Sequence, residues 1–246
     1  MHLADSHIHL QDYPSNEAQK VYEHAIKNNV CEFVVPSAHP TDWQKVLNTL
    51  HRFSGTIGAI GIHPWYIDSG TDIHFEILEK YLQKHSELWV GECGIDRIKN
   101  PDTSKQIPHL IRQAELAVKY NRPLLVHCVK ADKEFEQLFP ILPKKTLFHS
   151  FAGSLEWGKI LQKNGFYLGL NFSFFKKDES VEMLKQLDLN KILLETDAPY
   201  QPNKGYVKNS PENLPVLASA ISAVRGLSET EVEAILNRNF NEFKQK

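Results

Sequence analysis

Two kinds of apolar pattern alternate along the chain. Short apolar runs, most of them continuous, are separated by longer stretches in which apolar residues recur every three or four positions. Continuous runs are typical of parallel strands covered on both faces, and the longer period is typical of amphipathic helices. The pattern predicts eight strands, at residues 2–8, 31–38, 56–63, 88–95, 123–129, 146–151, 166–173 and 191–198.

The predicted helices lie between these strands and carry end signals. Asp42, Ser154 and Ser228 are predicted N-caps, because their side-chain oxygens can accept hydrogen bonds from free backbone N–H groups. Gly165 and Gly226 stand where a helix is expected to end. The helices are predicted at residues 16–28, 42–53, 74–84, 105–120, 132–142, 154–164 and 180–187, with two closing helices within residues 210–243.

Strands and helices alternate about eight times, which predicts an α/β fold of the (β/α)8 TIM barrel type with extra C-terminal helices. We see no linker or charge block in the 246 residues, so residues 1–246 are expected to form a single domain. A doubly wound open sheet is the alternative. It is disfavoured because no glycine-rich phosphate-binding motif follows the first strand.

Ionisable residues gather at the predicted strand ends, where TIM barrels carry their functional groups. In "LADSHIHLQDY", His7 and His9 stand two positions apart, so in a strand both imidazoles face the same side. Histidine nitrogens and carboxylate oxygens suit borderline divalent ions. Six candidate ligands exceed what one structural zinc ion needs, which indicates a centre with two ions. The residues at the other strand ends are His63, Glu92, His127, His149 and Asp197.

Each of these residues, taken alone, also has an ordinary structural explanation. A single histidine after an apolar run is more often a hydrogen-bonded strand terminus than a ligand. Glu92 could cap a helix, and Asp197, which precedes Ala-Pro, could form a turn. Glu195 is expected to point into the barrel, where it could hold a lysine or a histidine ligand. The convergence of many candidates at one end of the barrel favours the metal centre.

Six blocks of the sequence occur in one order: "DSHIHL", "GIHPW", "VGECGID", "PLLVHC", "HSFAGS" and "LLETDAPY". Together they resemble the signature blocks of the TatD-like deoxyribonucleases, metal-dependent hydrolases of the amidohydrolase superfamily. The resemblance spans residues 5 to about 213. It implies a TIM barrel that hydrolyses phosphodiester bonds of DNA, in single strands or at ends, with two divalent metal ions (Zn, Mn, Mg or Ni).

The resemblance also implies a role for each matched residue. Glu92 would bridge the two ions, Asp197 would accept a proton from the attacking water, and His63 would contact the substrate phosphate. These three residues would carry the catalysis. The implied ligands are His7, His9, Glu92 and Asp197 for the first ion, and Glu92, His127 and His149 for the second.

The chain departs from the family pattern outside the ligands. Val129 and Lys130 stand where an arginine and an acidic residue are usual, and Arg97 stands where an aromatic residue is usual. The last loop carries Lys204 and Lys208 in place of arginines. Lysine keeps the positive charge but lacks the two-pronged phosphate contact of arginine. We expect both lysines to bind substrate, while the substrate itself stays open.

Further lysines and aromatic residues fall in the loops after predicted strands. The lysines could form a positive rim, or could simply be solvated surface. The aromatic side chains could stack on unpaired bases, or could roof the barrel as part of its core. These residues are Lys130, Lys176 and Lys177, and Trp65, Phe151, Phe174, Phe175 and Tyr200.

Composition narrows the setting of this activity. The net charge of -2 and the pI of about 6.6 exclude a general attraction to polyanions, so DNA binding would need local lysines or metal ions. Three scattered cysteines and the absence of a signal-like or membrane-spanning apolar run predict a cytoplasmic protein without a membrane or an obligate protein partner.

Two other functions stay open from the sequence. The first is a related phosphoesterase, amidase or lactonase that uses the same ions on a small molecule. It is disfavoured because many such relatives bridge their ions with a modified lysine, whereas a glutamate stands at the bridge position here. The second is a protein that binds metal or nucleic acid without turnover. The complete ligand set disfavours it.

Overall fold

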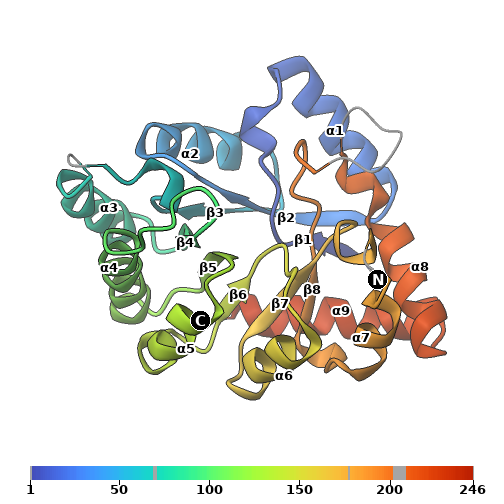
Figure 1. Ribbon diagram of the computed structural model, residues 1–246. Coiled ribbons are helices and arrows are strands. Elements are labelled where there is room, and N and C mark those ends of the chain that lie inside the picture. Colours follow the sequence, from blue (N-terminus) through green and yellow to red (C-terminus); the bar gives the residue numbers. More distant parts are fainter. Residues whose placement is uncertain (1, 69–70, 177, 202–208, 246) are drawn as a thin grey trace.

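Within the described residues, eight strands form one parallel sheet in sequential order, and the helices surround it (Figure 1). The computed structural model describes residues 2–68, 71–176, 178–201 and 209–245. The sequential order confirms the predicted TIM barrel and excludes the doubly wound sheet, in which strand order reverses. The strands are β1 (Leu3–Asp5), β2 (Val30–Pro36), β3 (Thr56–Ile60), β4 (Trp89–Asp96), β5 (Leu124–Val129), β6 (Thr146–Phe148), β7 (Tyr167–Leu170) and β8 (Ile192–Leu194).

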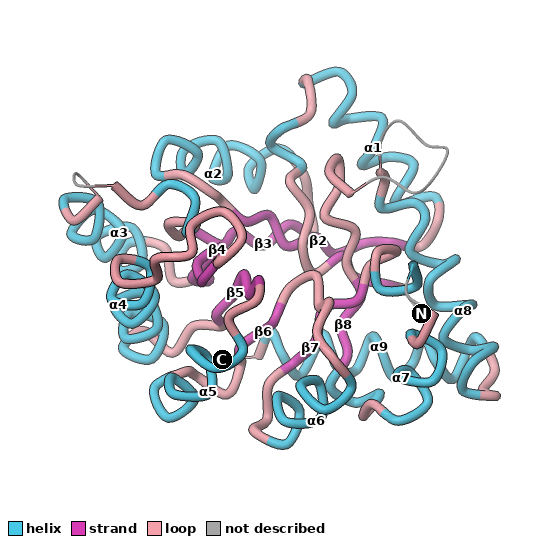
Figure 2. Tube along the Cα trace, in the orientation of Figure 1, coloured by secondary structure: helices cyan, strands magenta, loops and turns pink. Residues whose placement is uncertain are grey.

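Helices and strands alternate around the barrel, as the colours of Figure 2 show. Ser154 and Ser228 cap their helices as predicted, by accepting from the backbone N–H groups of Trp157 and Glu231. No helix in the described ranges is both long and apolar enough to cross a membrane. The helices are α1 (Ser15–Lys27), α2 (Trp43–Arg52), α3 (Ile73–Lys84), α4 (Gln106–Lys119), α5 (Asp132–Leu138), α6 (Leu155–Lys163), α7 (Ser180–Gln186), α8 (Leu214–Arg225) and α9 (Glu229–Lys244).

Several predicted boundaries were wrong. Asp42 does not cap α2 with its side chain, which instead accepts from the backbone N–H of His39 in the preceding 3-10 turn. Helix α5 ends at Leu138 rather than residue 142, because Pro140 lacks the N–H that an α-helix needs, and a 3-10 turn follows. Strand β1 ends at Asp5, so His7 lies beyond it.

Helix α9 closes the N-terminal end of the barrel. Trp89 and Tyr167 are the first residues of β4 and β7, and both pack against Phe243 of α9, with ring centroids 5.3 and 5.0 Å apart. Phe240 belongs to the same buried apolar cluster. This cluster fills one end of the barrel, which leaves the C-terminal ends of the strands as the open end.

The first and last strands meet at a seam made of a few specific bonds. The backbone N–H of Ser6 donates to the carbonyl of Leu194 (2.9 Å), and that of Asp197 donates to the carbonyl of His7 (2.8 Å). The buried Asp5 carboxylate accepts from the backbone N–H of Thr196 (3.0 Å), from its hydroxyl (2.5 Å) and from the backbone N–H of His7 (3.2 Å). We call residues 5–7 and 194–197 the β8–β1 seam.

Candidate metal centre

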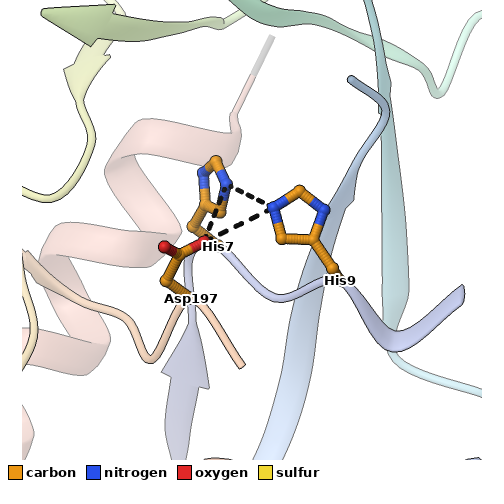
Figure 3. A group of neighbouring side chains, drawn as sticks. All are labelled: His7, His9 and Asp197. Carbon is orange, nitrogen blue, oxygen red and sulfur yellow. Dashed lines mark hydrogen bonds and ion pairs between the residues drawn. The ribbon is translucent and has the colours of Figure 1, made fainter. Parts of the chain in front are cut away.

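His7, His9 and Asp197 point toward one another at the open end of the barrel (Figure 3). The Nε2 atoms of His7 and His9 lie 3.3 Å apart, and Asp197 Oδ1 lies 3.7 Å from the first and 3.4 Å from the second. The two histidines follow β1 rather than lie within it, so the expectation that a strand places them on one side was wrong. They converge because the backbone N–H of His9 bonds to the carbonyl of Ala198, across the seam.

Glu92 lies at the middle of the cluster. Its Oε2 is 3.3 Å from His7 Nε2, and its Oε1 contacts three further rings. These contacts are His127 Nδ1 at 3.1 Å, His149 Nε2 at 3.3 Å and His63 Nε2 at 3.4 Å. The structure therefore brings together all the predicted site residues that it describes, while Lys204 and Lys208 lie outside the described residues.

Two glycines allow Glu92 to take this place within β4. The sequence predicted Glu92 at the end of a strand, but β4 continues to Asp96. Gly91 and Gly94 have φ values of 140° and 149°, which side chains rarely permit, and a Cβ at either would overlap β5. The pairing of β4 with β5 shifts between Val90 and Cys93, as expected for a bulge that redirects a side chain.

Two further carboxylates contact His127 and His149 on the side of each ring that faces away from Glu92. Asp96 Oδ2 lies 3.1 Å from Nε2 of His127, and Glu195 Oε1 lies 3.2 Å from Nδ1 of His149. A ring nitrogen that donates its proton to a carboxylate leaves the other nitrogen with a free lone pair. In both histidines that other nitrogen faces Glu92, which is the arrangement of a metal ligand. The expectation that Glu195 could hold a histidine ligand is thus consistent with its contact.

His63 has the opposite arrangement. Its Nδ1 accepts the backbone N–H of Trp65 (3.2 Å), so its Nε2 carries the proton of the neutral ring. That N–H points toward Glu92 as a donor rather than a lone pair. His63 is therefore suited to contact an anionic group beside the centre.

Burial and mutual charge set the protonation of the cluster. Burial lowers the pKa of both His7 and His149, which favours the neutral rings that bind metal. Burial alone would raise the pKa of Glu92, but the surrounding histidines outweigh it and hold the pKa well below its usual value. Burial alone would raise the pKa of Asp197, but its hydrogen bond with His9 and the nearby histidines lower that pKa to about 2. Burial alone would lower the pKa of His9, but the same hydrogen bond with Asp197 raises it to about 8.

The donor set fits divalent ions. Nitrogen and oxygen ligands at about 2.0–2.1 Å from a tetrahedral ion lie about 3.3–3.4 Å from one another. The ligand atoms of His7, His9 and Asp197 are 3.3–3.7 Å apart. The Nε2 atoms of His7 and His9 and the Oδ1 atom of Asp197 therefore converge on one point, as the ligands of a cation do.

Two residues of the site were not singled out from the sequence. Asp96 stands four positions after Glu92 on the same strand, and this even spacing is the signal that places both on one side. Gln201 donates to Asp197 Oδ2 (2.6 Å) and to Ser150 Oγ (2.9 Å). No pattern pointed to Gln201, because its role depends on how the loop after β8 folds.

A cleft of about 730 Å³ lies over the centre. Trp65 and Tyr200 line the cleft and are about half exposed. Phe151 and Phe174 are instead buried in the core, which was the alternative prediction for the aromatic residues. Lys130 and Lys176 are exposed but do not line the cleft. Lys177 lies outside the described residues.

A parallel barrel that gathers histidines and carboxylates at the C-terminal ends of its strands defines the class of TIM-barrel metal-dependent hydrolases. A family model described as TatD related DNase matches residues 4–245. The chain belongs to this family, as the sequence blocks predicted.

Individual relatives agree with this assignment. The chain is 30% identical to the putative deoxyribonuclease TATDN3 of Mus musculus, over 96% of this chain and 86% of that protein. It is 28% identical to the deoxyribonuclease TATDN3 of Homo sapiens, over 96% and 92%. The crystal structure of YJJV, a TatD homologue from Escherichia coli, has a TM-score of 0.91 at 24% identity and covers 98% of this chain and 97% of that one.

Proposed function

We propose that this chain hydrolyses phosphodiester bonds of DNA, at ends or in single strands, with two divalent metal ions. The observation that carries the proposal is the position of Glu92, one carboxylate whose two oxygens face two separate groups of histidines. A carboxylate shared in this way is what a two-ion centre requires. The human relative is named a deoxyribonuclease, which supports DNA as the substrate.

The ligands divide into two sets that share Glu92. His7, His9 and Asp197 complete the first set, and His127 and His149 complete the second. Divalent ions bound there would polarise the phosphodiester and make hydroxide available near neutral pH. Zinc, manganese, magnesium and nickel are all candidates, because cellular availability decides among them as much as ligand type does.

The chain's own residues then orient the substrate and move the proton. Asp197 is held ionised, so it can accept the proton of the attacking water. His63 donates its Nε2–H to a phosphate oxygen, because its Nδ1 is already an acceptor. Asp96 and Glu195 keep the two histidines of the second set in the ligand tautomer.

The proposal extends to the setting of the reaction. Lys204 and Lys208 bind the DNA backbone, in keeping with the need for a local positive field on a chain of net charge -2. Residues 1–246 act as one catalytic domain in the cytoplasm, which is consistent with three cysteines that are all free.

The test is cleavage of single-stranded DNA by metal-stripped protein, resupplied with each candidate ion, next to Glu92→Gln. We expect restored cleavage with about two ions per chain, and at least a 100-fold loss of activity with lower ion content in Glu92→Gln. Glu182→Gln is the matched control, because this glutamate lies on the exposed side of α7.

A wild-type protein that binds two ions but leaves DNA intact would contradict the proposal. It would direct the search to small phosphoesters, amides and lactones. Full cleavage by Glu92→Gln would contradict the shared-carboxylate centre.

A further inference from the structure

Trp65 differs from the other tryptophans of this chain. It is 51% exposed, whereas Trp43, Trp89 and Trp157 are all buried, at 2–5% exposure. Trp65 lines the cleft together with Tyr66 and Tyr200, which are also about half exposed, and such a group of exposed rings is typical of a binding surface. The three buried tryptophans fill the core, and they cannot report on a ligand in the cleft.

Trp65 lies beside the second set of ligands. It lines the cleft and follows His63 in the 3-10 turn Pro64–Tyr66. Its ring centroid is 5.0 Å from that of His63 and 6.1 Å from that of His127. A group stacked on the indole would therefore sit next to the phosphate that His63 contacts.

The indole is fixed before any ligand arrives. Its Nε1–H donates to Asp96 Oδ2 at 2.6 Å, and the other Asp96 oxygen accepts from the backbone N–H groups of Ile98 and Lys99, both at 2.9 Å. The same Asp96 carboxylate contacts His127. One carboxylate thus holds both the indole and a metal ligand, which sets the spacing between the stacking surface and the centre.

The described side chains that line the cleft carry little positive charge for a nucleic acid strand. Among its described lining residues there is no lysine or arginine, and acidic side chains such as Asp12 and Asp42 are present. Lys99 does not line the cleft, but its Nζ lies 5.6 Å from the centroid of the Trp65 ring, so the described side chains supply few positive charges for the DNA backbone. Stacking of a base on an aromatic ring does not need charge and tolerates any base sequence.

We propose that Trp65 is the base-stacking residue of this site, and that the nucleotide next to the scissile phosphate must present an unpaired base. This inference rests on the proposed function, since the unpaired base is a feature of the DNA substrate that the same site would recognise. A base within a duplex is stacked on its neighbours and cannot reach the indole. The proposal therefore assigns the site to single strands and frayed ends.

The first experiment measures tryptophan fluorescence of the metal-loaded protein. The probes are an eight-residue oligothymidylate with phosphorothioate linkages, which react slowly, and an abasic strand with the same linkages. We expect quenching by the oligothymidylate and little by the abasic strand. In Trp65→Leu the base-dependent quenching should disappear, while the emission of the three buried tryptophans stays.

The second experiment compares cleavage of single-stranded DNA by variants. Trp65→Leu should raise KM about tenfold or more with kcat changed less than about threefold, since stacking contributes mainly to binding. Trp65→Phe keeps an aromatic face and should restore most of the KM. Ile98→Ala is the matched control, because Ile98 is exposed on the loop after β4 and does not line the cleft.

The outcomes separate this inference from the proposed function. Cleavage of DNA with equal quenching by both probes, or an unchanged KM in Trp65→Leu, would overturn the role of Trp65 and leave the nuclease intact. Base-dependent quenching without any cleavage would support Trp65 and overturn the proposed function. A Trp65→Leu defect in kcat alone, not rescued by phenylalanine, would show that Trp65 only positions Asp96.

Discussion

At the scale of single residues, the centre depends on side chains that do not face it. A histidine binds an ion only through a nitrogen that carries no proton, so Asp96 and Glu195 decide which nitrogen of His127 and His149 is free. Glu195 in turn needs space inside the barrel. Gly169 of β7 provides it, because a Cβ at this position would overlap the Glu195 carboxylate.

We predict that Gly169→Ala displaces Glu195 and with it His149. The free energy of unfolding should fall by about 1–3 kcal/mol, as for other overpacked interiors, and affinity for the second ion should fall roughly 10- to 100-fold. Denaturant unfolding and ion titration measure the two effects. Gly226→Asn is the control, because Gly226 ends α8 in open space and asparagine tolerates its left-handed φ of 65°. Unchanged ion affinity in Gly169→Ala would mean that Glu195 does not orient His149.

The sequence could predict the residues of the cluster but not the residues that support them. His7, His9, Glu92 and Asp197 are ionisable residues that follow or interrupt apolar runs, so a local pattern was enough to select them. Gly169 acts through Glu195, which is distant in sequence, and a single chain contains no signal for such a contact. The aromatic residues were ambiguous for the same reason, since exposure depends on how neighbouring loops pack.

At the scale of elements, the order of strands was predictable and their ends were not. Continuous apolar runs mark a parallel strand wherever it is covered on both faces. The apolar runs in the sequence continue past the last hydrogen bond between strands, however, because the loops that carry the candidate ligands are also buried. Ile8 is fully buried, although β1 ends at Asp5. Burial therefore predicted where the barrel lies, and hydrogen bonding decided where each strand ends.

The β8–β1 seam gives a prediction at this scale. Thr196→Val keeps the shape of the side chain but removes the hydroxyl that donates to the buried Asp5. We expect the free energy of unfolding to fall by about 1–3 kcal/mol, the cost of a buried acceptor that loses a donor. Affinity for the first ion should fall as well, because His7 and Asp197 lie across this seam.

Thr56→Val is the matched control for the seam. Thr56 also donates its hydroxyl, in this case to the backbone carbonyl of Phe53, at the start of β3 and away from the seam. This variant should lose stability without losing ion affinity. If both valine variants bound ions as the wild type does, the seam would not position the first set of ligands.

At the scale of the whole molecule, the two ends of the barrel have different tasks. Helix α9 fills the N-terminal end with aromatic side chains, and the C-terminal end carries the cluster of histidines and carboxylates. Stability and chemistry are thereby separated along the barrel axis, as in other TIM barrels. The centre nevertheless joins strands from around the whole barrel, so its ions should stabilise the entire fold.

We predict that removal of the ions lowers the Tm by roughly 5–10 °C. Ions at about 100 times their Kd add about 2.7 kcal/mol to stability, and 1 kcal/mol corresponds to about 2–4 °C for a chain of this size. Thermal unfolding before and after chelation, and after reloading, measures the shift. Glu92→Gln should respond much less to chelation. Equal Tm values for stripped and loaded wild type would contradict a centre that spans the barrel.

The β8–β1 seam has a consequence for how the protein is made. His7 and His9 leave the ribosome early, whereas Asp197 follows about 190 residues later, which takes about 10–40 s at ordinary rates of synthesis. During that interval the first set of ligands is incomplete, and no ion can hold it together. Loading of the first ion is therefore expected only once Asp197 has been synthesised, whereas Glu92, His127 and His149 of the second set are all present by residue 149.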